Sequence, residues 1–181
     1  KSESGIPVIV VAAGASSRMQ GTNKQLTLLG GIPVLIRTLS VFEKSKDISN
    51  IILVVRDEDL FEIQMLCTKY MISKVSDIVC GGKTRQESVL KGFARLKESD
   101  NAVLIHDGAR PFVDSTIINS VASALENCNA VTCGLTTSWL GHIRAMDCFS
   151  TTYIPENLLR EAFRAQGRVL GVDPNKKKGE K

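Results

Sequence analysis

Short apolar segments alternate with amphipathic segments along most of this chain, and the alternation limits the folds it can adopt. Apolar runs typical of buried strands occur at residues 8–11, 51–55, 76–80, 102–106 and 130–135. These runs are apolar throughout, which is expected when both faces of a strand are covered. We therefore expect an α/β fold with a mainly parallel sheet and helices on both faces.

The residues that begin helices support the same alternation. Pro33, after a turn at Gly30-Gly31, suits the first position of a helix that continues to residue 44. Asp57 and Asp114 are expected to cap the helices that follow them, and Thr84 with Glu87 forms a capping box. A further helix at residues 155–165 and a short strand at residues 168–172 are predicted near the end of the chain.

The first strand leads into a loop of small residues, Ala12-Ala-Gly-Ala-Ser-Ser, followed by Arg18 and Lys24. Small residues allow a ligand to approach the backbone, and successive N–H groups in such a turn can bind an anion. The spacing fits neither a Walker A loop nor a dinucleotide-binding fingerprint. The loop therefore suggests a polyphosphate site, with an ordinary strand-to-helix turn as the alternative.

Two later strand ends carry similar chemistry. Residues 81–88, Gly-Gly-Lys-Thr-Arg-Gln-Glu-Ser, join a strand to a capped helix whose N-terminus can bind an anion; a solvated helix cap is the alternative. In His106-Asp-Gly-Ala-Arg110 the aspartate follows a buried strand, where a carboxylate facing a triphosphate is best explained as a Mg²⁺ ligand. Arg110 offers a fork for a phosphate, and an Asp107–Arg110 ion pair is the alternative. His106 is interpreted as a packed side chain.

These three loops resemble the motifs of the 2-C-methyl-D-erythritol 4-phosphate cytidylyltransferases of the non-mevalonate isoprenoid pathway. The first resembles A-A-G-x-G-x-R-M…K-Q, with Ser16 in place of the second glycine and Asn23 in place of a proline. The second matches G-G-x-x-R-x-x-S-V, and the third matches H-D-[AG]-A-R-P-F. The resemblance implies a Rossmann-like nucleotidyltransferase domain over residues 1–181 that transfers CMP from CTP to methylerythritol phosphate and releases pyrophosphate.

The resemblance also implies roles for individual residues. The residues implied to bind the nucleotide are Ala12, Ala13, Gly14, Ala15, Ser16, Gly82, Arg85 and Ser88. Arg18 and Lys24 would offset the charge on the reacting phosphates, and Asp107 would hold Mg²⁺. Arg110 and Thr137 would position the sugar phosphate.

The last third of the chain departs from the family pattern. Residues 136–155 are interpreted as a remnant of the β-arm that pairs two subunits, and the family's D-T-x-K lysine is missing there. Arg144 and Lys177 are assigned to the catalytic group as counterparts of the family's arm arginine and late lysine. The chain is either a shortened member or lacks segments, and the family order of the surviving fragments favours the second reading.

Composition limits the class of protein. With 43% hydrophobic and 23% charged residues the chain resembles a globular domain, and its net charge of +4 is too small to suggest nucleic acid. No apolar run has the roughly 18–20 residues of a membrane span, and no signal peptide is evident, although a start without methionine leaves an upstream targeting segment open. Five cysteines without C-x-x-C pairs suggest reduced thiols and a cytoplasmic protein. By resemblance we expect a homodimer.

Other functions remain open from the sequence. Ribitol 5-phosphate cytidylyltransferases share the chemistry, but their first loop more often begins L-A-G-G. Guanylyltransferases of the molybdopterin type share a short loop without the second and third motifs. A dehydrogenase is disfavoured because Arg56 follows the second strand, where an acidic ribose ligand is needed. A nucleotide-binding module without turnover is the alternative from another class.

Overall fold

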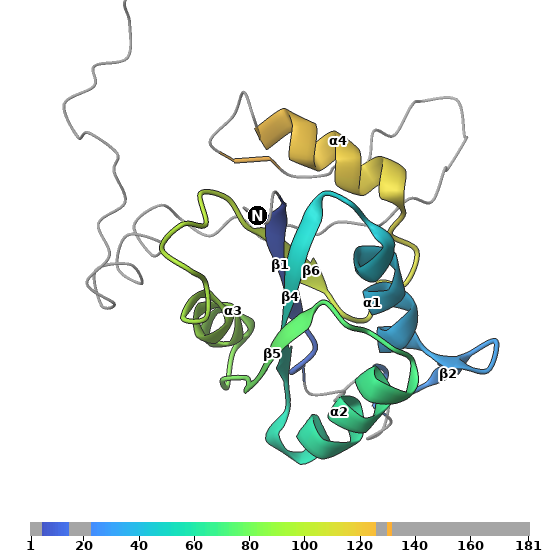
Figure 1. Ribbon diagram of the computed structural model, residues 1–181. Helices are drawn as coiled ribbons and strands as arrows, with labels where there is room; N and C mark the ends of the chain where they lie inside the picture. The colour runs from blue at the N-terminus through green and yellow to red at the C-terminus, as the bar shows by residue number, and fades with distance from the viewer. Residues whose placement is uncertain (1–4, 15–22, 126–129, 132–181) are drawn as a thin grey trace, which may run out of the picture.

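The computed structural model of this chain describes residues 5–14, 23–125 and 130–131. In this part of the chain, four parallel strands form a sheet in the order β5-β4-β1-β6 (Figure 1). The strands are β1 (Ile6–Val11), β4 (Ile48–Val55), β5 (Val75–Cys80) and β6 (Leu104–Asp107). A small antiparallel hairpin pairs β2 (Leu28–Leu29) with β3 (Ile32–Pro33). The expected parallel α/β sheet is confirmed.

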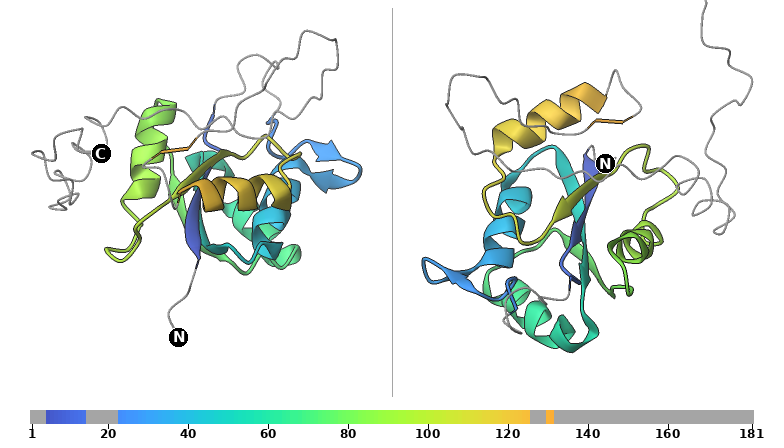
Figure 2. Two further views of the ribbon diagram at one scale, coloured as in Figure 1. Left: turned by 90° about the horizontal axis from the view of Figure 1, so that it is seen from above. Right: turned by 180° about the vertical axis from the view of Figure 1, so that it is seen from behind.

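Helices cover both faces of the sheet, as expected. They are α1 (Val34–Lys44), α2 (Leu60–Lys69), α3 (Arg85–Phe93) and α4 (Ser115–Leu125), and the 3-10 turn η2 (Asp57–Asp59) precedes α2. Figures 1 and 2 show α3 on one face, with α1 and α2 on the other. α4 contributes Ile118 and Val121 to the same core cluster as α1.

The central strand β1 explains why its sequence is apolar without alternation. Val8 and Val10 pack into the core cluster under α1, α2 and α4, whereas Ile9 and Val11 pack under α3. Each of these four side chains is at most 8% exposed. β4 alternates between the two clusters in the same way, so both central strands are covered on both faces.

Several details of the sequence interpretation need correction. Asp57 does not cap a helix: η2 and α2 have no side-chain cap, and the Asp57 carboxylate accepts a hydrogen bond from the Cys80 thiol instead. Pro33 ends β3, and α1 begins one residue later, at Val34. In the first turn of α1, the Val34 and Leu35 N–H groups donate to the carbonyls of Thr27 and Gln25, respectively. The short strands beside Gly30-Gly31 were not predicted, although both glycines have the positive φ that a tight hairpin requires.

Other expectations are confirmed or fall outside the described residues. The Thr84 hydroxyl accepts a hydrogen bond from the Glu87 N–H, and Asp114 caps α4 through the Ile117 N–H. Of the strand predicted at residues 130–135, only 130 and 131 are described, and neither is in a strand. The arm remnant at 136–155, the helix at 155–165 and the strand at 168–172 lie outside the described part. No helix within that part is both long and apolar enough to cross a bilayer.

Gly92 is where α3 lies against the sheet. A Cβ at this position would lie 2.6 Å from Ile9 Cγ2 and 3.2 Å from Val54 Cγ2, both on buried β-branched side chains that have little room to move. The close approach of helix and sheet therefore requires glycine.

We predict that Gly92→Ala lowers the free energy of unfolding. Overpacking should cost about 1–3 kcal/mol, which outweighs the gain of up to about 1 kcal/mol from better helix propensity. Urea denaturation followed by circular dichroism would measure the difference. Gln86→Ala, at an exposed position of the same helix, is the control and should be nearly neutral. A Gly92→Ala protein at least as stable as the parent would contradict this description of the packing.

Candidate functional site

The strand order reverses at one position. The chain moves outward from β1 to β4 and β5, and then returns to the other side of β1 to form β6. The crossovers through α1 and α2 lie on one face of the sheet, and the returning crossover through α3 lies on the other, so the order reverses between β1 and β6, beside Val11 and its partner Asp107. In open parallel sheets, ligands bind at such a switch point.

The first loop starts there and is held by the sheet. The Ala12 N–H donates to the Val54 carbonyl at 2.6 Å, and Ala12 is buried. A Cβ on Gly81 would overlap the Cβ of Ala13, so the first and second loops are in direct contact. Gly14 is exposed, and apart from its chain neighbours no atom of the described residues lies within 4 Å of the place where its Cβ would be. The small residues thus bring two loops together and leave open space at Gly14.

Lys24 lies in a tight turn, residues 23–27, which we call the Lys24 turn. The Asn23 carbonyl accepts hydrogen bonds from the N–H groups of Leu26 and Thr27, each at 3.1 Å. On its other side, carbonyls of the turn accept hydrogen bonds from α1: the Leu35 N–H donates to Gln25 O at 3.0 Å, and the Val34 N–H donates to Thr27 O at 2.9 Å. The first turn of α1 therefore holds the backbone around Lys24.

The second loop is organised by Ser88. Its hydroxyl accepts a hydrogen bond from the Gly82 N–H at 3.0 Å and donates to the Thr84 carbonyl at 2.9 Å. Ser88 is 2% exposed, and these two hydrogen bonds shape the loop from inside. The Lys83 N–H is bound by Glu87 Oε2 at 2.8 Å, which completes the turn into α3.

The third loop joins the second through a shared carboxylate. Asp107 Oδ1 accepts hydrogen bonds from Arg85 Nε at 3.0 Å and Nη2 at 2.8 Å, and Oδ2 accepts one from Arg110 Nε at 3.1 Å. The Asp107 side chain is 25% exposed, and the arginines are about a third exposed. The Asp107–Arg110 ion pair that the sequence left as an alternative is therefore present, and Arg85 forms a second pair.

Residues below the site fix this third loop. The Gly108 N–H donates to the Val11 carbonyl at 2.8 Å, and the Thr38 hydroxyl donates to the Gly108 carbonyl at 2.9 Å. His106 is 1% exposed and packs edge-on against Phe42 with ring centroids 5.1 Å apart, which agrees with its interpretation as a packed side chain. α1 thus supports both the Lys24 turn and the Asp107 loop.

The structure brings together the described members of the predicted site, which are Ala12, Ala13, Gly14, Lys24, Gly82, Arg85, Ser88, Asp107 and Arg110. The members that lie outside the described residues are Ala15, Ser16, Arg18, Thr137, Arg144 and Lys177. The sequence analysis missed three supporting residues, Thr38, Asn23 and Asp59. Only Asn23 carried a signal, because it departs from the family pattern beside Lys24.

A hollow elsewhere on the surface lacks the cationic side chains of these loops among its lining residues. It measures about 470 Å³ and lies between α2 and β5, lined by residues that include Cys67, Met71 and Asp77. Asp77 is its one charged residue, so it offers no paired cations for a phosphate. We therefore place the candidate site at the three loops.

Comparison with known proteins gives a consistent result. The model of the 2-C-methyl-D-erythritol 4-phosphate cytidylyltransferase family matches residues 6–145. Proteins of that name from Halalkalibacterium halodurans and Clostridium acetobutylicum are 44% and 40% identical, over 68% and 83% of this chain. The chain spans 54% and 66% of their respective lengths.

Solved structures agree with these sequence matches. The crystal structure of 4-diphosphocytidyl-2C-methyl-D-erythritol synthase from Anaerococcus prevotii superposes with a TM-score of 0.59 at 32% identity. The match covers 69% of this chain and 52% of that one. The likeness therefore extends to the three-dimensional arrangement of the described elements.

Cys80, at the end of β5 beside the second loop, gives a test of the local electrostatics. Its thiol donates to Asp57 Oδ1 at 3.1 Å. That hydrogen bond, with desolvation and the negative charge of Asp57, raises the pKa of Cys80. We predict that Asp57→Ala lowers this pKa, so that a larger thiolate fraction makes Cys80 react several-fold faster with iodoacetamide near neutral pH.

Peptide mass mapping over time would give the alkylation rate of each cysteine. Cys67 is the internal control, because burial raises its pKa to about 11 and it should react slowly in both proteins. An unchanged Cys80 rate in the Asp57→Ala protein would contradict the predicted effect of the carboxylate.

Proposed function

Because this chain belongs to the 2-C-methyl-D-erythritol 4-phosphate cytidylyltransferase family, we propose that it transfers CMP from CTP to 2-C-methyl-D-erythritol 4-phosphate and releases pyrophosphate. The observation that carries the proposal is the meeting of three strand-end loops at the switch point of the sheet. Gly108 there lies against Ala12 and against Gln25, the residue after Lys24, while Arg85 and Arg110 bind Asp107, so cations suited to an anionic ligand gather at these loops.

The chemistry requires no nucleophile from the protein. A phosphate oxygen of the acceptor attacks the α-phosphorus of CTP, and a new P–O bond forms. The bond from that phosphorus to the bridging oxygen breaks, and its electron pair leaves with pyrophosphate. Catalysis then consists of aligning two anions and offsetting the charge that develops between them, which suits a site of cations and backbone donors.

The described residues divide this work. The backbone around Ala12 to Gly14 lines the space that a triphosphate would enter, and Lys24 would stabilise the charge on the reacting and leaving phosphates. The N-terminus of α3, with Gly82 and Arg85, would bind the nucleoside. Arg110 would hold the phosphate of the acceptor.

Asp107 fits a Mg²⁺ ion brought in with the nucleotide. The described residues contain no cluster of three or more His, Cys, Asp or Glu side chains that could hold a metal alone. Mg²⁺ in nucleotide sites is commonly bound by one or two carboxylates together with substrate phosphates, and a partly exposed aspartate at a strand end can supply such a ligand. When bound, the ion would supply further neutralisation of phosphate charge.

When Mg²⁺ binds a carboxylate oxygen of Asp107, the arginine that is hydrogen-bonded to that oxygen, Arg85 or Arg110, would release it. Both guanidiniums are already within hydrogen-bonding distance of the carboxylate, so they would stay beside the bound phosphates. The same arginines can therefore hold Asp107 in place before CTP binds and neutralise phosphate afterwards.

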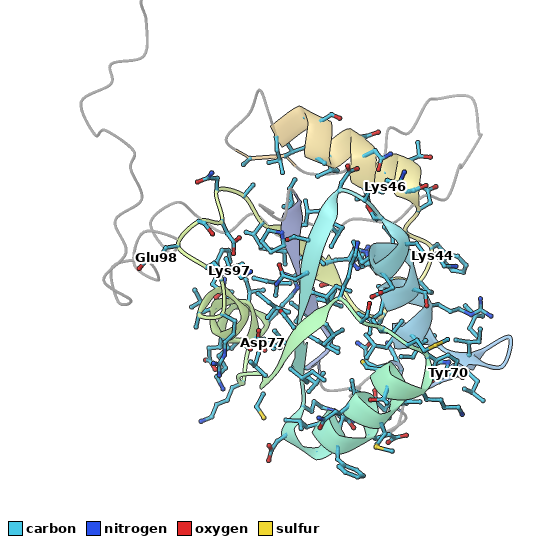
Figure 3. The ribbon with its side chains drawn as sticks, viewed as in Figure 1. Lys44, Lys46, Tyr70, Asp77, Lys97 and Glu98 are labelled. Carbon is cyan, nitrogen blue, oxygen red and sulfur yellow. The ribbon has the colours of Figure 1, made fainter. Side chains whose placement is uncertain are left out.

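We predict that Lys24→Ala lowers the rate of pyrophosphate release by about 100- to 1,000-fold, as the loss of a charge-stabilising donor does in other enzymes. Stability should change little. The assay combines the 181-residue chain with CTP, Mg²⁺ and 2-C-methyl-D-erythritol 4-phosphate. Lys46→Ala is the matched control, because Lys46 lies at the far end of α1, near α4 (Figure 3), and should leave the rate unchanged.

The same assay separates the alternative functions. Pyrophosphate release with ribitol 5-phosphate alone would identify ribitol 5-phosphate as the acceptor in place of 2-C-methyl-D-erythritol 4-phosphate. Thermal protection by CTP without turnover on either acceptor would identify a nucleotide-binding module. No protection and no turnover by a folded chain would reject the proposal.

We predict that Asp107→Asn raises the Mg²⁺ concentration needed for half-maximal activity by tenfold or more, because a neutral amide is a weaker ligand than a carboxylate. A Mg²⁺ titration at fixed CTP would measure the shift. Asp77→Asn, on the edge strand β5 (Figure 3), is the control for a change of net charge. An identical Mg²⁺ dependence in parent and Asp107→Asn proteins would exclude Asp107 as a metal ligand.

A further inference from the structure

A buried carboxylate lies directly behind the Lys24 turn and has no part in the chemistry described so far. Asp59 is 6% exposed. Its Oδ2 accepts hydrogen bonds from Asn23 Nδ2 at 2.8 Å and Arg56 Nε at 2.7 Å, and its Oδ1 accepts one from Arg56 Nη2 at 2.9 Å. We call Asn23, Arg56 and Asp59 the Asp59 anchor. It connects the turn that carries Lys24 to the end of β4.

Asn23 transmits this connection to the backbone beside Lys24. Its carboxamide donates to Asp59 through Nδ2, and the Oδ1 of the same group accepts the Gln25 N–H at 3.0 Å. The Asn23 carbonyl accepts two further N–H groups of the turn. Because one planar amide is held at both ends, the orientation of residues 23–25 is fixed relative to Asp59.

Arg56 makes the anchor electrically balanced. It binds both carboxylate oxygens of Asp59 and also pairs with Glu58. A buried carboxylate without such a partner would carry a large desolvation cost. The pairing lets Asp59 act as a fixed acceptor for Asn23.

The Lys24 turn is therefore held from two sides by elements that are far apart in sequence. The first turn of α1 binds the carbonyls of Gln25 and Thr27, and the Asp59 anchor binds Asn23. A long lysine side chain has many rotamers, so its reach to a phosphate depends on a fixed backbone.

We propose that Asn23 and Asp59 are positioning residues that set the backbone of the Lys24 turn so that the Lys24 ammonium meets the reacting phosphates. The inference rests on the proposed function. Neither residue touches the substrates in this account, and both act through Lys24.

The first test is Asn23→Ala, which leaves the Arg56–Asp59 pair intact. We expect kcat for pyrophosphate release to fall about 10- to 100-fold, with a smaller change in the KM for CTP, because a misplaced group costs rate more than binding. The double substitution N23D/D59N exchanges donor and acceptor, and its kcat should be higher than that of Asn23→Ala. Glu43→Gln is the matched control: Glu43 also accepts two hydrogen bonds from another element, Ser73 and Lys74, away from the site.

Measuring the effect of Asn23→Ala in a Lys24→Ala protein distinguishes a positioning role of Asn23 from a general loss of stability. If Asn23 acts through Lys24, adding Asn23→Ala to Lys24→Ala should lower kcat by less than threefold further, so the two effects are strongly non-additive. Equal losses of kcat in both backgrounds, or an unchanged kcat in Asn23→Ala alone, would overturn the inference.

Amide hydrogen exchange keeps the test independent of turnover. In Asn23→Ala we expect the N–H groups of Gln25, Leu26 and Thr27 to exchange at least tenfold faster, while those of α3 are unchanged. A parent chain without turnover would reject the proposed function alone. Unchanged exchange in the Lys24 turn would reject the positioning inference, whether or not the parent is active.

Discussion

The carboxyl end of β1 positions the loops of the candidate site, because this strand is held along both edges and on both faces. β1 is hydrogen-bonded to β4 along one edge and to β6 along the other, and both of its faces are buried. Val11 pairs with Val54 and Asp107, and its carbonyl holds the Gly108 N–H. A shift of register by one residue would exchange the side chains that pack under the two layers of helices, so the packing determines where the loops begin.

Asp59 and Asp107, both at this end of the sheet, are paired with arginines, but the two pairings have different consequences. Asp107 and its arginines are a quarter to a third exposed, so each pair contributes at most about 1 kcal/mol to stability. Such a pair can exchange its partner for a ligand at little cost. The Asp59 side chain is only 8% exposed, and removing Arg56 would leave a buried charge uncompensated at a cost of several kcal/mol. The first arrangement suits binding, and the second suits a permanent attachment.

Sequence reasoning predicted best those features that depend on neighbouring residues. The apolar periodicity predicts α1 and its end at Lys44, and a four-residue pattern predicts the Thr84 cap. The three loops could be assigned to one edge because parallel strands end together. The Asp57 cap was wrong because a competing contact with Cys80, 23 residues away, was invisible locally.

The supporting contacts were missed for the same reason. Asn23 and Asp59 are 36 residues apart, and Thr38 and Gly108 are 70 apart. No spacing rule connects such pairs, because they meet only when the crossover helices have packed. The position of the loops at one edge of the sheet was therefore predictable from the sequence, whereas the residues that hold the loops in place required the structure.

The small residues of the loops have a second role that their size alone did not indicate from the sequence. From the sequence, their size suggested room for a ligand. A Cβ on Gly81 would overlap Ala13, and one on Gly108 would lie 2.9 Å from both Gln25 Oε1 and Leu35 Cδ1. At these positions the missing side chain is needed for the loops to pack against one another. Among the described glycines of these loops, Gly14 alone has no described atom beyond its chain neighbours within 4 Å of its Cβ position, so small size leaves space for a ligand there. Tight packing of the surrounding loops and an open backbone at their meeting point are what a pre-organised anion site requires.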